Sequence, residues 1–205
     1  MPKQLRDGFY LPDTDTRHTS LSQFEIAHIR SVLPRCAQCR TAIDIGAHVG
    51  SWAIVLSYGF DTVHAFEPEE ENYRCLELNT EKMPNIVRYK KALGDKFLQG
   101  KLKIGVEGNS GTWYLMPGED VEVLALDDYE FRGVDLLKID VEGFEYFVIQ
   151  GAKKTIERER PVIVIEVTNN LYRYDLWMED LREEIELLGY RLDEKLNNNW
   201  VFVPQ

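Results

Sequence analysis

The sequence contains no long apolar run of the kind that a membrane helix requires. No stretch approaches the roughly 20 uncharged apolar residues that span a bilayer, and residues 1–15 are too polar for a secretory signal peptide. We therefore expect a cytoplasmic protein. Linkers rich in Gly, Ser or Pro and internal repeats are missing as well, and 205 residues suffice for one well-buried core but are short for two.

Cysteine and positive charge are also scarce. The three cysteines include one CxxC pair, Cys36 and Cys39, without the second pair or the histidines of a structural zinc site. We expect ordinary reduced thiols. Only 24 basic residues stand against 35 acidic ones, and the net charge of -11 would repel a polyanion. The composition thus argues against a nucleic-acid substrate.

Short apolar runs and helical patterns alternate along the chain. Strands are predicted at 41–45, 62–66, 86–89, 134–141, 161–167, 190–193 and 200–203, the last two as a hairpin. Helices are predicted at 21–33 with Ser20 as N-cap, and at 49–58, 69–82, 146–159 and 176–188. Residues 96–125 are predicted to hold an inserted pair of antiparallel strands. This alternation indicates an α/β fold with a largely parallel sheet that helices cover on both faces.

The carboxyl ends of the first two strands carry residues suited to a ligand, which in such a sheet lies beyond those ends. The first strand ends in a DxGxxxG pattern, in which Gly46 allows close approach, rather than in the GxGxxG of a dinucleotide site. Asp44 would repel a pyrophosphate but suits a cationic amine or sulfonium. Glu67 is placed to accept hydrogen bonds from ribose hydroxyls. Both features fit S-adenosylmethionine, although each alone is also explained by a tight turn or a solvated acid.

Three acids follow the central strand. Asp140, Glu142 and Glu145 lie within six positions, and burial of such charges without partners is costly. One interpretation is that they act on a substrate. The alternatives are structural: Glu142 and Glu145 would be the N-terminal acids of the next helix, and Lys138, on the same strand face as Asp140, would be its salt-bridge partner.

Five segments of the chain carry more specific signatures. They are DIGAHVGSWA (44–53), FEPEEENYRCLELN (66–79), ALGD (92–95), LALDDY (124–129) and LLKIDVEGFEYFVIQGA (136–152). In order and spacing they resemble the FkbM-like family of S-adenosylmethionine-dependent class I methyltransferases. The resemblance implies a Rossmann-like, doubly wound, mostly parallel seven-stranded sheet with an antiparallel C-terminal hairpin and a small β insertion. Residues 41–205 would form the methyltransferase domain, and residues 1–40 an N-terminal helical segment that is a candidate substrate lid.

The resemblance also implies which residues bind S-adenosylmethionine. The cofactor-binding residues would be Asp44, Gly46, Ala47, Gly50, Glu67, Pro68, Ala92, Leu93 and Asp140. The first four of these would hold the methionine end of the cofactor. Glu67 would hold the ribose, and Ala92 and Leu93 would border the adenine.

Two further features near these positions also have a structural explanation. His48 stands where the family more often has asparagine, and packing is favoured over a role as a base. Asn109, Ser110 and Gly111 lie where the family often has a similar polar-glycine pair, and turn formation explains them equally well.

The predicted function is O-methylation of a hydroxyl on a sugar, glycan or other small metabolite. Asp140 or Glu142 is the candidate catalytic base, since a partly desolvated carboxylate has a raised pKa. Oxygen ligands suit magnesium, so a divalent cation held by Asp140 with Glu166 and Asn169 or Asn170 is an open alternative that is not favoured.

Two other functions compete with this prediction. A catalytically inactive adenosine-binding or scaffold domain would keep the fold without an acceptor pocket. An NAD-dependent oxidoreductase is disfavoured because the second glycine of GxGxxG is missing. The sequence specifies neither the acceptor nor the oligomeric state. Candidates for lining the acceptor site are the aromatic residues Trp113, Tyr114, Tyr172, Tyr174 and Trp177.

Overall fold

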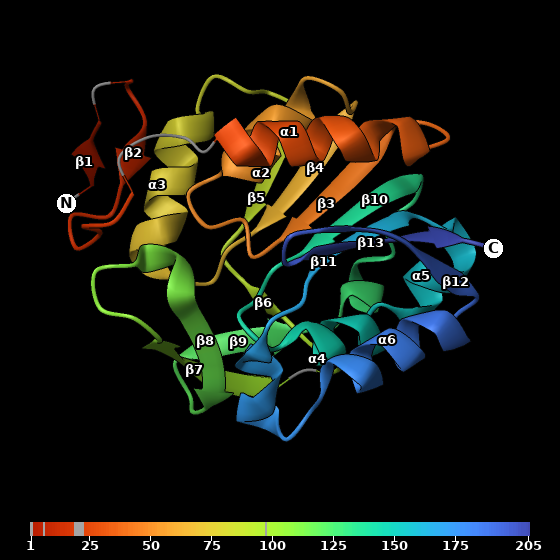
Figure 1. The fold of residues 1–205 in the computed structure, drawn as a ribbon. Coiled ribbons are helices and arrows are strands. Elements are labelled where there is room, and N and C mark those ends of the chain that lie inside the picture. Colours follow the sequence, from red (N-terminus) through yellow and green to blue (C-terminus); the bar gives the residue numbers. More distant parts are fainter. Residues whose placement is uncertain (1, 6, 19–22, 97) are drawn as a thin grey trace.

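A seven-stranded sheet forms the centre of the protein in the computed structural model, which describes residues 2–5, 7–18, 23–96 and 98–205 (Figure 1). The strands run in the order β12, β13, β11, β10, β3, β4, β5. Their bounds are β3 (Thr41–Ile45), β4 (Thr62–Phe66), β5 (Ile86–Tyr89), β10 (Val134–Ile139), β11 (Val162–Glu166), β12 (Tyr190–Leu196) and β13 (Asn199–Pro204). The first five are parallel, whereas β13 is antiparallel to β11 and β12. The predicted doubly wound, mostly parallel sheet with an antiparallel C-terminal hairpin is therefore confirmed.

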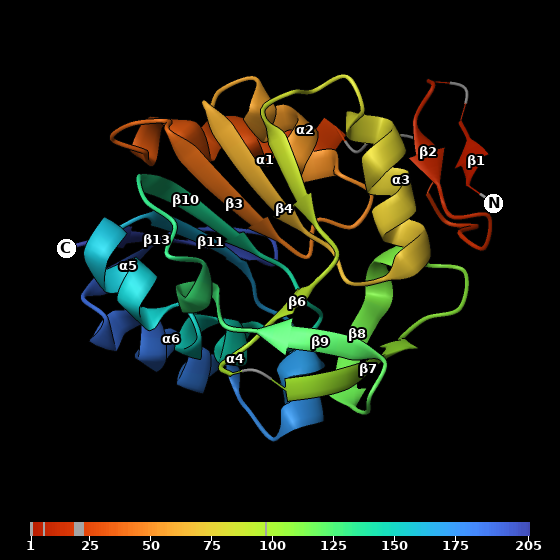
Figure 2. The same ribbon diagram turned by 180° about the vertical axis from the view of Figure 1, so that it is seen from behind.

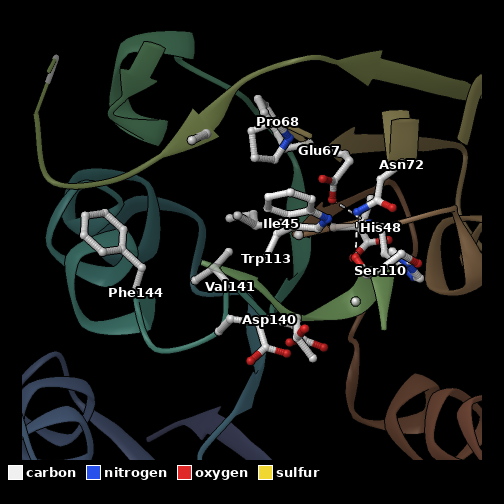
Figure 3. A pocket seen from close by; sticks show the side chains of 18 of the residues that line it. Ile45, His48, Glu67, Pro68, Asn72, Ser110, Trp113, Asp140, Val141 and Phe144 are labelled. Atoms are coloured by element: carbon white, nitrogen blue, oxygen red, sulfur yellow. Dashed lines mark hydrogen bonds between the residues drawn. The ribbon is translucent and has the colours of Figure 1, made fainter. Parts of the chain in front are cut away.

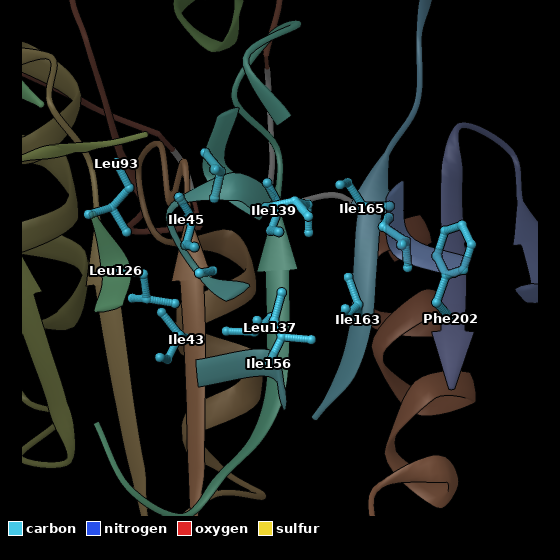
Figure 4. Close-up of a cluster of buried hydrophobic side chains, with 14 of the residues drawn as sticks. Ile43, Ile45, Leu93, Leu126, Leu137, Ile139, Ile156, Ile163, Ile165 and Phe202 are labelled. Atoms are coloured by element: carbon cyan, nitrogen blue, oxygen red, sulfur yellow. The ribbon is translucent and has the colours of Figure 1, made fainter. Parts of the chain in front are cut away.

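Helices cover both faces of this sheet, because alternate residues of each strand point to opposite sides (Figures 1 and 2). One face carries α1 (Gln23–Val32), α2 (Ser51–Ser57) and α3 (Glu70–Thr80), and the other carries α4 (Glu145–Gln150), α5 (Lys153–Glu159) and α6 (Met178–Leu187). Within β3, Ala42 faces the first group, whereas Ile43 and Ile45 face the second. Figure 4 shows the second cluster, in which these isoleucines lie with Ile156 of α5 and Phe202 of β13.

The predicted helix over 146–159 is two helices in the structure. α4 and α5 are separated at Gly151 and Ala152. A β-carbon on Gly151 would lie 1.7 Å from the carbonyl oxygen of Gly94, so the two backbones pass in direct contact at this break. The other predicted helices are present. α2, α3 and α6 have slightly shorter bounds than predicted, and α1 ends at Val32. None of the helices in the described part of the chain is long and apolar enough to cross a membrane.

The N-terminal segment contains more than the predicted helix. β1 (Lys3–Gln4) and β2 (Tyr10–Leu11) form a short antiparallel hairpin, and the 3-10 helix η1 (Leu33–Arg35) follows α1. The predicted cap, Ser20, lies outside the described residues. Ile29 and Val32 of α1 are fully buried in the same cluster as α2. This part of the segment therefore belongs to the main core.

The insertion is larger than the predicted strand pair. β6 (Ala92–Leu93), β7 (Leu98–Ile104), β8 (Trp113–Pro117) and β9 (Val121–Leu124) form a second sheet in the order β6, β9, β7, β8. β7 is antiparallel to β8 and β9, as the pattern predicted, and β6 adds a parallel edge. The short 3-10 helix η2 (Ser110–Thr112) precedes β8. This second sheet lies beyond the carboxyl ends of β3 and β4 (Figure 2).

Candidate active site

A cavity of about 270 Å³ lies where the carboxyl ends of the central strands meet the second sheet. Nine of the residues predicted from the sequence line it: Asp44, Gly46, Ala47, Glu67, Pro68, Ala92, Leu93, Asp140 and Glu142. Gly50 lies outside this lining. Gly50 is the N-cap of α2 and has a φ of 100°. A β-carbon at this position would lie 2.9 Å from Leu76 Cδ1. The requirement for glycine at position 50 thus comes from turn geometry and helix packing.

Gly46 closes the turn that follows β3. Its φ is 79°, and a β-carbon at this position would lie 1.7 Å from the carbonyl oxygen of Asp140. The backbone N–H groups of Gly46 and Ala47 both donate to Phe66 O, at 3.0 and 2.8 Å. Asp140 N donates to Ile45 O at 2.9 Å. The turn is therefore tied to the ends of both neighbouring strands, β4 and β10.

Glu67, directly after β4, is buried with its carboxylate held by two backbone donors. His48 N donates to Glu67 Oε2 and Glu69 N donates to Oε1, both at 2.9 Å. Burial raises the pKa of Glu67 to about 7, although these two hydrogen bonds oppose the rise. Each oxygen keeps a lone pair for a further donor, because a carboxylate oxygen accepts more than one hydrogen bond. Figure 3 shows Glu67 beside His48 at the edge of the cavity.

Asp140, Glu142 and Glu166 bring three carboxylates together at the carboxyl ends of β10 and β11. One oxygen of each lies within 4.8 Å of the others. Lys138 Nζ lies 3.0 Å from Asp140 Oδ2, and Asn170 Nδ2 donates to Glu142 Oε2 at 2.6 Å. Burial and the charges of Asp140 and Glu145 raise the pKa of Glu142 to about 7. The charge of Asp140, together with burial, also raises the pKa of Glu166.

The structural roles predicted as alternatives for Asp140, Glu142 and Glu145 are present for some of these acids and not for others. Glu145 is buried, and its Oε1 accepts hydrogen bonds from Val141 N at 3.0 Å and Gly143 N at 3.1 Å, so it holds the loop before α4. Glu142 has a φ of 57° and lines the cavity instead. The predicted salt bridge between Lys138 and Asp140 is present, and Lys138 is almost completely buried beneath it. Asp140 therefore both lines the cavity and forms an ion pair with Lys138.

The carboxylate oxygens would fit a hard divalent cation, which takes oxygen ligands. Lys138 already places a positive charge against Asp140, and its Nζ also lies 5.2 Å from the Trp52 ring centroid. A resident ammonium lowers the need for a second cation at this position. The arrangement thus permits a metal ion without requiring one.

Several lining residues were not singled out from the sequence. His18 reaches the cavity from the N-terminal segment, and Asn72 of α3 is buried in its wall, with Nδ2 donating to Ser110 O at 2.9 Å. Nothing in the local sequence around either residue indicates this position, because each depends on a contact distant in the chain. Asn109, Ser110 and Gly111, by contrast, were singled out from the sequence, and all three line the cavity. Asn109 Oδ1 also accepts a hydrogen bond from Gly111 N, as a turn requires.

Of the five aromatic candidates, Trp113 lines the cavity (Figure 3). Tyr174 Oη instead donates to Leu115 O at 2.5 Å, and the Arg173 guanidinium stacks on Tyr114 with its Cζ 4.3 Å from the ring centroid. Tyr172 and Trp177 pack against each other, with ring centroids 4.7 Å apart, and remain exposed. The other four aromatic residues therefore have structural or surface positions.

Comparison with known proteins identifies a methyltransferase family and related structures. A family profile described as the methyltransferase FkbM domain matches residues 44–192. Among solved structures, the methyltransferase FkbM of Methylobacillus flagellatus KT superposes with a TM-score of 0.60 at 18% identity, over 89% of this chain and 48% of that one. The chain thus spans about half the length of that protein. A search of curated proteins finds no significant match.

Two further structures match almost end to end. Precorrin 8W decarboxylase from Methanobacterium thermoautotrophicum has a TM-score of 0.55 at 12% identity, over 95% of this chain and 98% of that one. Precorrin-6y C5,15-methyltransferase from Geobacter metallireducens GS-15 has a TM-score of 0.54 at 16% identity, over 97% and 93%. At such low identity these likenesses establish the fold, not the substrate.

Proposed function

Because the chain belongs to the methyltransferase FkbM domain family, we propose that it is an S-adenosylmethionine-dependent methyltransferase that acts on a hydroxyl group of a sugar, glycan or other small metabolite. The observation that carries the proposal is the convergence of Asp44, Gly46 and Glu67 on one cavity. Each residue type is common at strand ends. Together they offer an acid, a close backbone approach and a second acid fixed by two N–H donors.

The residues present fit this cofactor. Asp44 is almost fully buried at the end of β3, where a carboxylate suits the cationic methionine end. Glu67 would accept hydrogen bonds from the ribose hydroxyls. Pro68, Ala92 and Leu93 form an apolar part of the lining next to Glu67, suited to the adenine. When bound, the cofactor would supply an electrophilic methyl group.

The acid cluster would serve the acceptor. Glu142 Oε2 is held by Asn170, and its pKa of about 7 suits a general base that works near neutral pH. Asp140, held by Lys138, is the second candidate. Either carboxylate would take the proton of the acceptor hydroxyl while the hydroxyl oxygen bonds to the methyl carbon, the methyl–sulfur bond breaks and S-adenosylhomocysteine leaves as the neutral thioether. The walls of the cavity would align the two reactants.

Two measurements test the proposal. Calorimetry should detect binding of S-adenosylhomocysteine, and a turnover assay with labelled S-adenosylmethionine should detect methyl transfer to a panel of free hexoses, hexuronic acids and oligosaccharides. Cofactor binding without turnover on any hydroxylated acceptor would favour an inactive adenosine-binding domain. Absence of cofactor binding would contradict the proposal altogether.

A chelator tests the role of a metal ion separately. We expect full turnover in excess EDTA, because Lys138 already provides a cation beside Asp140. Loss of turnover in EDTA, with recovery on addition of Mg²⁺, would assign the three carboxylates to a metal site instead.

A further inference from the structure

Asp15 links the N-terminal segment to the β insertion. Its side chain is almost completely buried, although the residue lies in an irregular segment between β2 and α1. Asp15 Oδ2 accepts hydrogen bonds from Ser110 N at 2.9 Å and from Ser110 Oγ at 2.6 Å, across 95 residues of sequence. Asp15 Oδ1 accepts from Arg17 N at 3.0 Å and from His18 N at 2.9 Å. A second link joins the same two segments, since Thr16 N donates to Gly108 O at 2.9 Å.

These hydrogen bonds stabilise the ionised form of Asp15. Both of its oxygens accept from backbone N–H groups, which can only donate. Although burial raises its pKa, hydrogen bonds from His18 and Ser110 outweigh that effect and hold the pKa of Asp15 well below its usual range. The ionised carboxylate therefore receives the one hydroxyl proton of Ser110.

The orientation of Ser110 fixes the tautomer of His48. His48 Nε2 lies 2.7 Å from Ser110 Oγ, and the hydroxyl has no proton left to donate to it. His48 must therefore donate from Nε2 to Ser110 Oγ. Burial lowers the pKa of His48 to about 4, so the ring is neutral near pH 7 and carries its single proton on Nε2. A chain of donors thus runs from His48 through Ser110 to Asp15 (Figure 3 shows the His48 and Ser110 part).

The same histidine contacts the ribose-site acid through its backbone. His48 has a φ of 51°, in the left-handed region that non-glycine residues rarely adopt. In this conformation its N–H donates to Glu67 Oε2 at 2.9 Å. Such backbone strain persists only where the surroundings hold it. The bond from Nε2 to Ser110 is the hydrogen bond that anchors the His48 ring.

We propose that Asp15 is a positioning residue for Glu67: it fixes Ser110, Ser110 fixes His48, and the His48 backbone N–H fixes the carboxylate that binds the cofactor ribose. This inference rests on the proposed function, because it presumes an adenosine cofactor at Glu67. The N-terminal segment then has a role beyond that of a lid over the acceptor. It completes the cofactor site from the N-terminal end of the chain.

The test compares S-adenosylhomocysteine with its 2′-deoxy analogue by calorimetry, in the wild-type chain and in Asp15→Asn and Ser110→Ala. The wild type should bind the deoxy analogue about tenfold more weakly, the size of one hydrogen bond to a charged group. Both variants should bind S-adenosylhomocysteine about five- to tenfold more weakly, and their penalty for the deoxy analogue should shrink to about twofold. A purely structural defect would weaken both ligands alike and leave the ratio unchanged.

Thr16→Ala is the matched control. Thr16 is adjacent and exposed, and its hydroxyl donates to Gly108 O of the same turn rather than to Ser110 or His48. It should retain wild-type affinity and the full deoxy penalty. Ser110→Ala keeps the test decisive if Asp15→Asn fails to fold, since it removes only a hydroxyl. Wild-type binding with an undiminished deoxy penalty in Ser110→Ala would overturn this inference alone. No binding by the wild type would overturn the proposed function as well.

Discussion

Gly46 is the residue whose replacement the site tolerates least. In Gly46→Ala the new β-carbon would lie 1.7 Å from the Asp140 carbonyl oxygen, in a backbone conformation with a φ of 79°. We expect a loss of about 3 kcal/mol or more in the free energy of unfolding. Gly59→Ala is the control, because its nearest neighbours lie at 3.7 Å and its φ is not positive. Urea denaturation of both variants measures the difference, and equal stabilities would contradict it.

Glu142 and Asp140 are the two candidate general bases, and substitution of each tests its role in catalysis. Glu142→Gln keeps the shape of the side chain and removes its basicity, so we expect kcat to fall about a hundredfold, with little change in the affinity for S-adenosylhomocysteine. In the wild type kcat should rise with pH up to about 7, as Glu142 loses its proton, and the variant should lack this rise.

Asp140→Asn is the parallel test for the second carboxylate. It removes the negative charge that lies 3.0 Å from Lys138 Nζ, so cofactor affinity must be measured separately from turnover. Undiminished turnover in both variants would remove the acid cluster from the mechanism.

Glu67 makes stability depend on pH. Its pKa in the folded protein is raised by burial from the usual 4.5 to about 7. The folded state therefore holds a proton that the unfolded state releases, and this contribution to stability is present below pH 4.5 and is lost as the pH rises through 7. In the wild type, this proton release should lower the free energy of unfolding by an amount on the order of 3 kcal/mol between pH 4.5 and 8. Glu67→Gln should lack this decrease and should bind the cofactor more weakly. Thermal unfolding across this range checks the sign, and parallel curves for variant and wild type would contradict it.

At the scale of elements, the strands were predictable and the contacts between distant segments were not. β3, β4 and β5 have the predicted bounds, because a buried parallel strand is recognisable as an apolar run. The break between α4 and α5 was missed, since it depends on the Gly94 backbone more than 50 residues earlier. The insertion was underestimated by two strands, because β6 is only two residues long and β9 only four.

One such distant contact, at the start of α5, allows a prediction of its own. Asp127 lies in the 3-10 helix η3 (Leu126–Tyr129), and its carboxylate accepts hydrogen bonds from Lys154 N at 3.0 Å and from Thr155 N and Oγ1, both at 2.8 Å. It thus caps a helix 27 residues later. We expect Asp127→Ala to cost about 1–2 kcal/mol of unfolding free energy. Asp128→Ala, at an exposed neighbouring position, should cost little, and a reversed order of the two in denaturant unfolding would contradict the cap.

At the scale of the whole molecule, three parts distant in sequence build one cavity. The central sheet supplies Asp44, Glu67 and Asp140, the insertion supplies Ser110, and the N-terminal segment supplies His18. The first group could be predicted, because the topology of a parallel sheet brings the carboxyl ends of its strands to one edge. From the insertion, Ala92 and Leu93 were indicated by the family resemblance alone. The contribution of His18 could not be predicted, since no local pattern records which loops will meet.

The most direct test of the account is a crystal structure of the chain with S-adenosylhomocysteine. We expect the ribose hydroxyls within hydrogen-bonding distance of Glu67, the methionine end beside Asp44 and Gly46, and the sulfur facing Asp140 and Glu142. A ligand bound outside this cavity, or bound within it with its ribose remote from Glu67, would contradict the central claim.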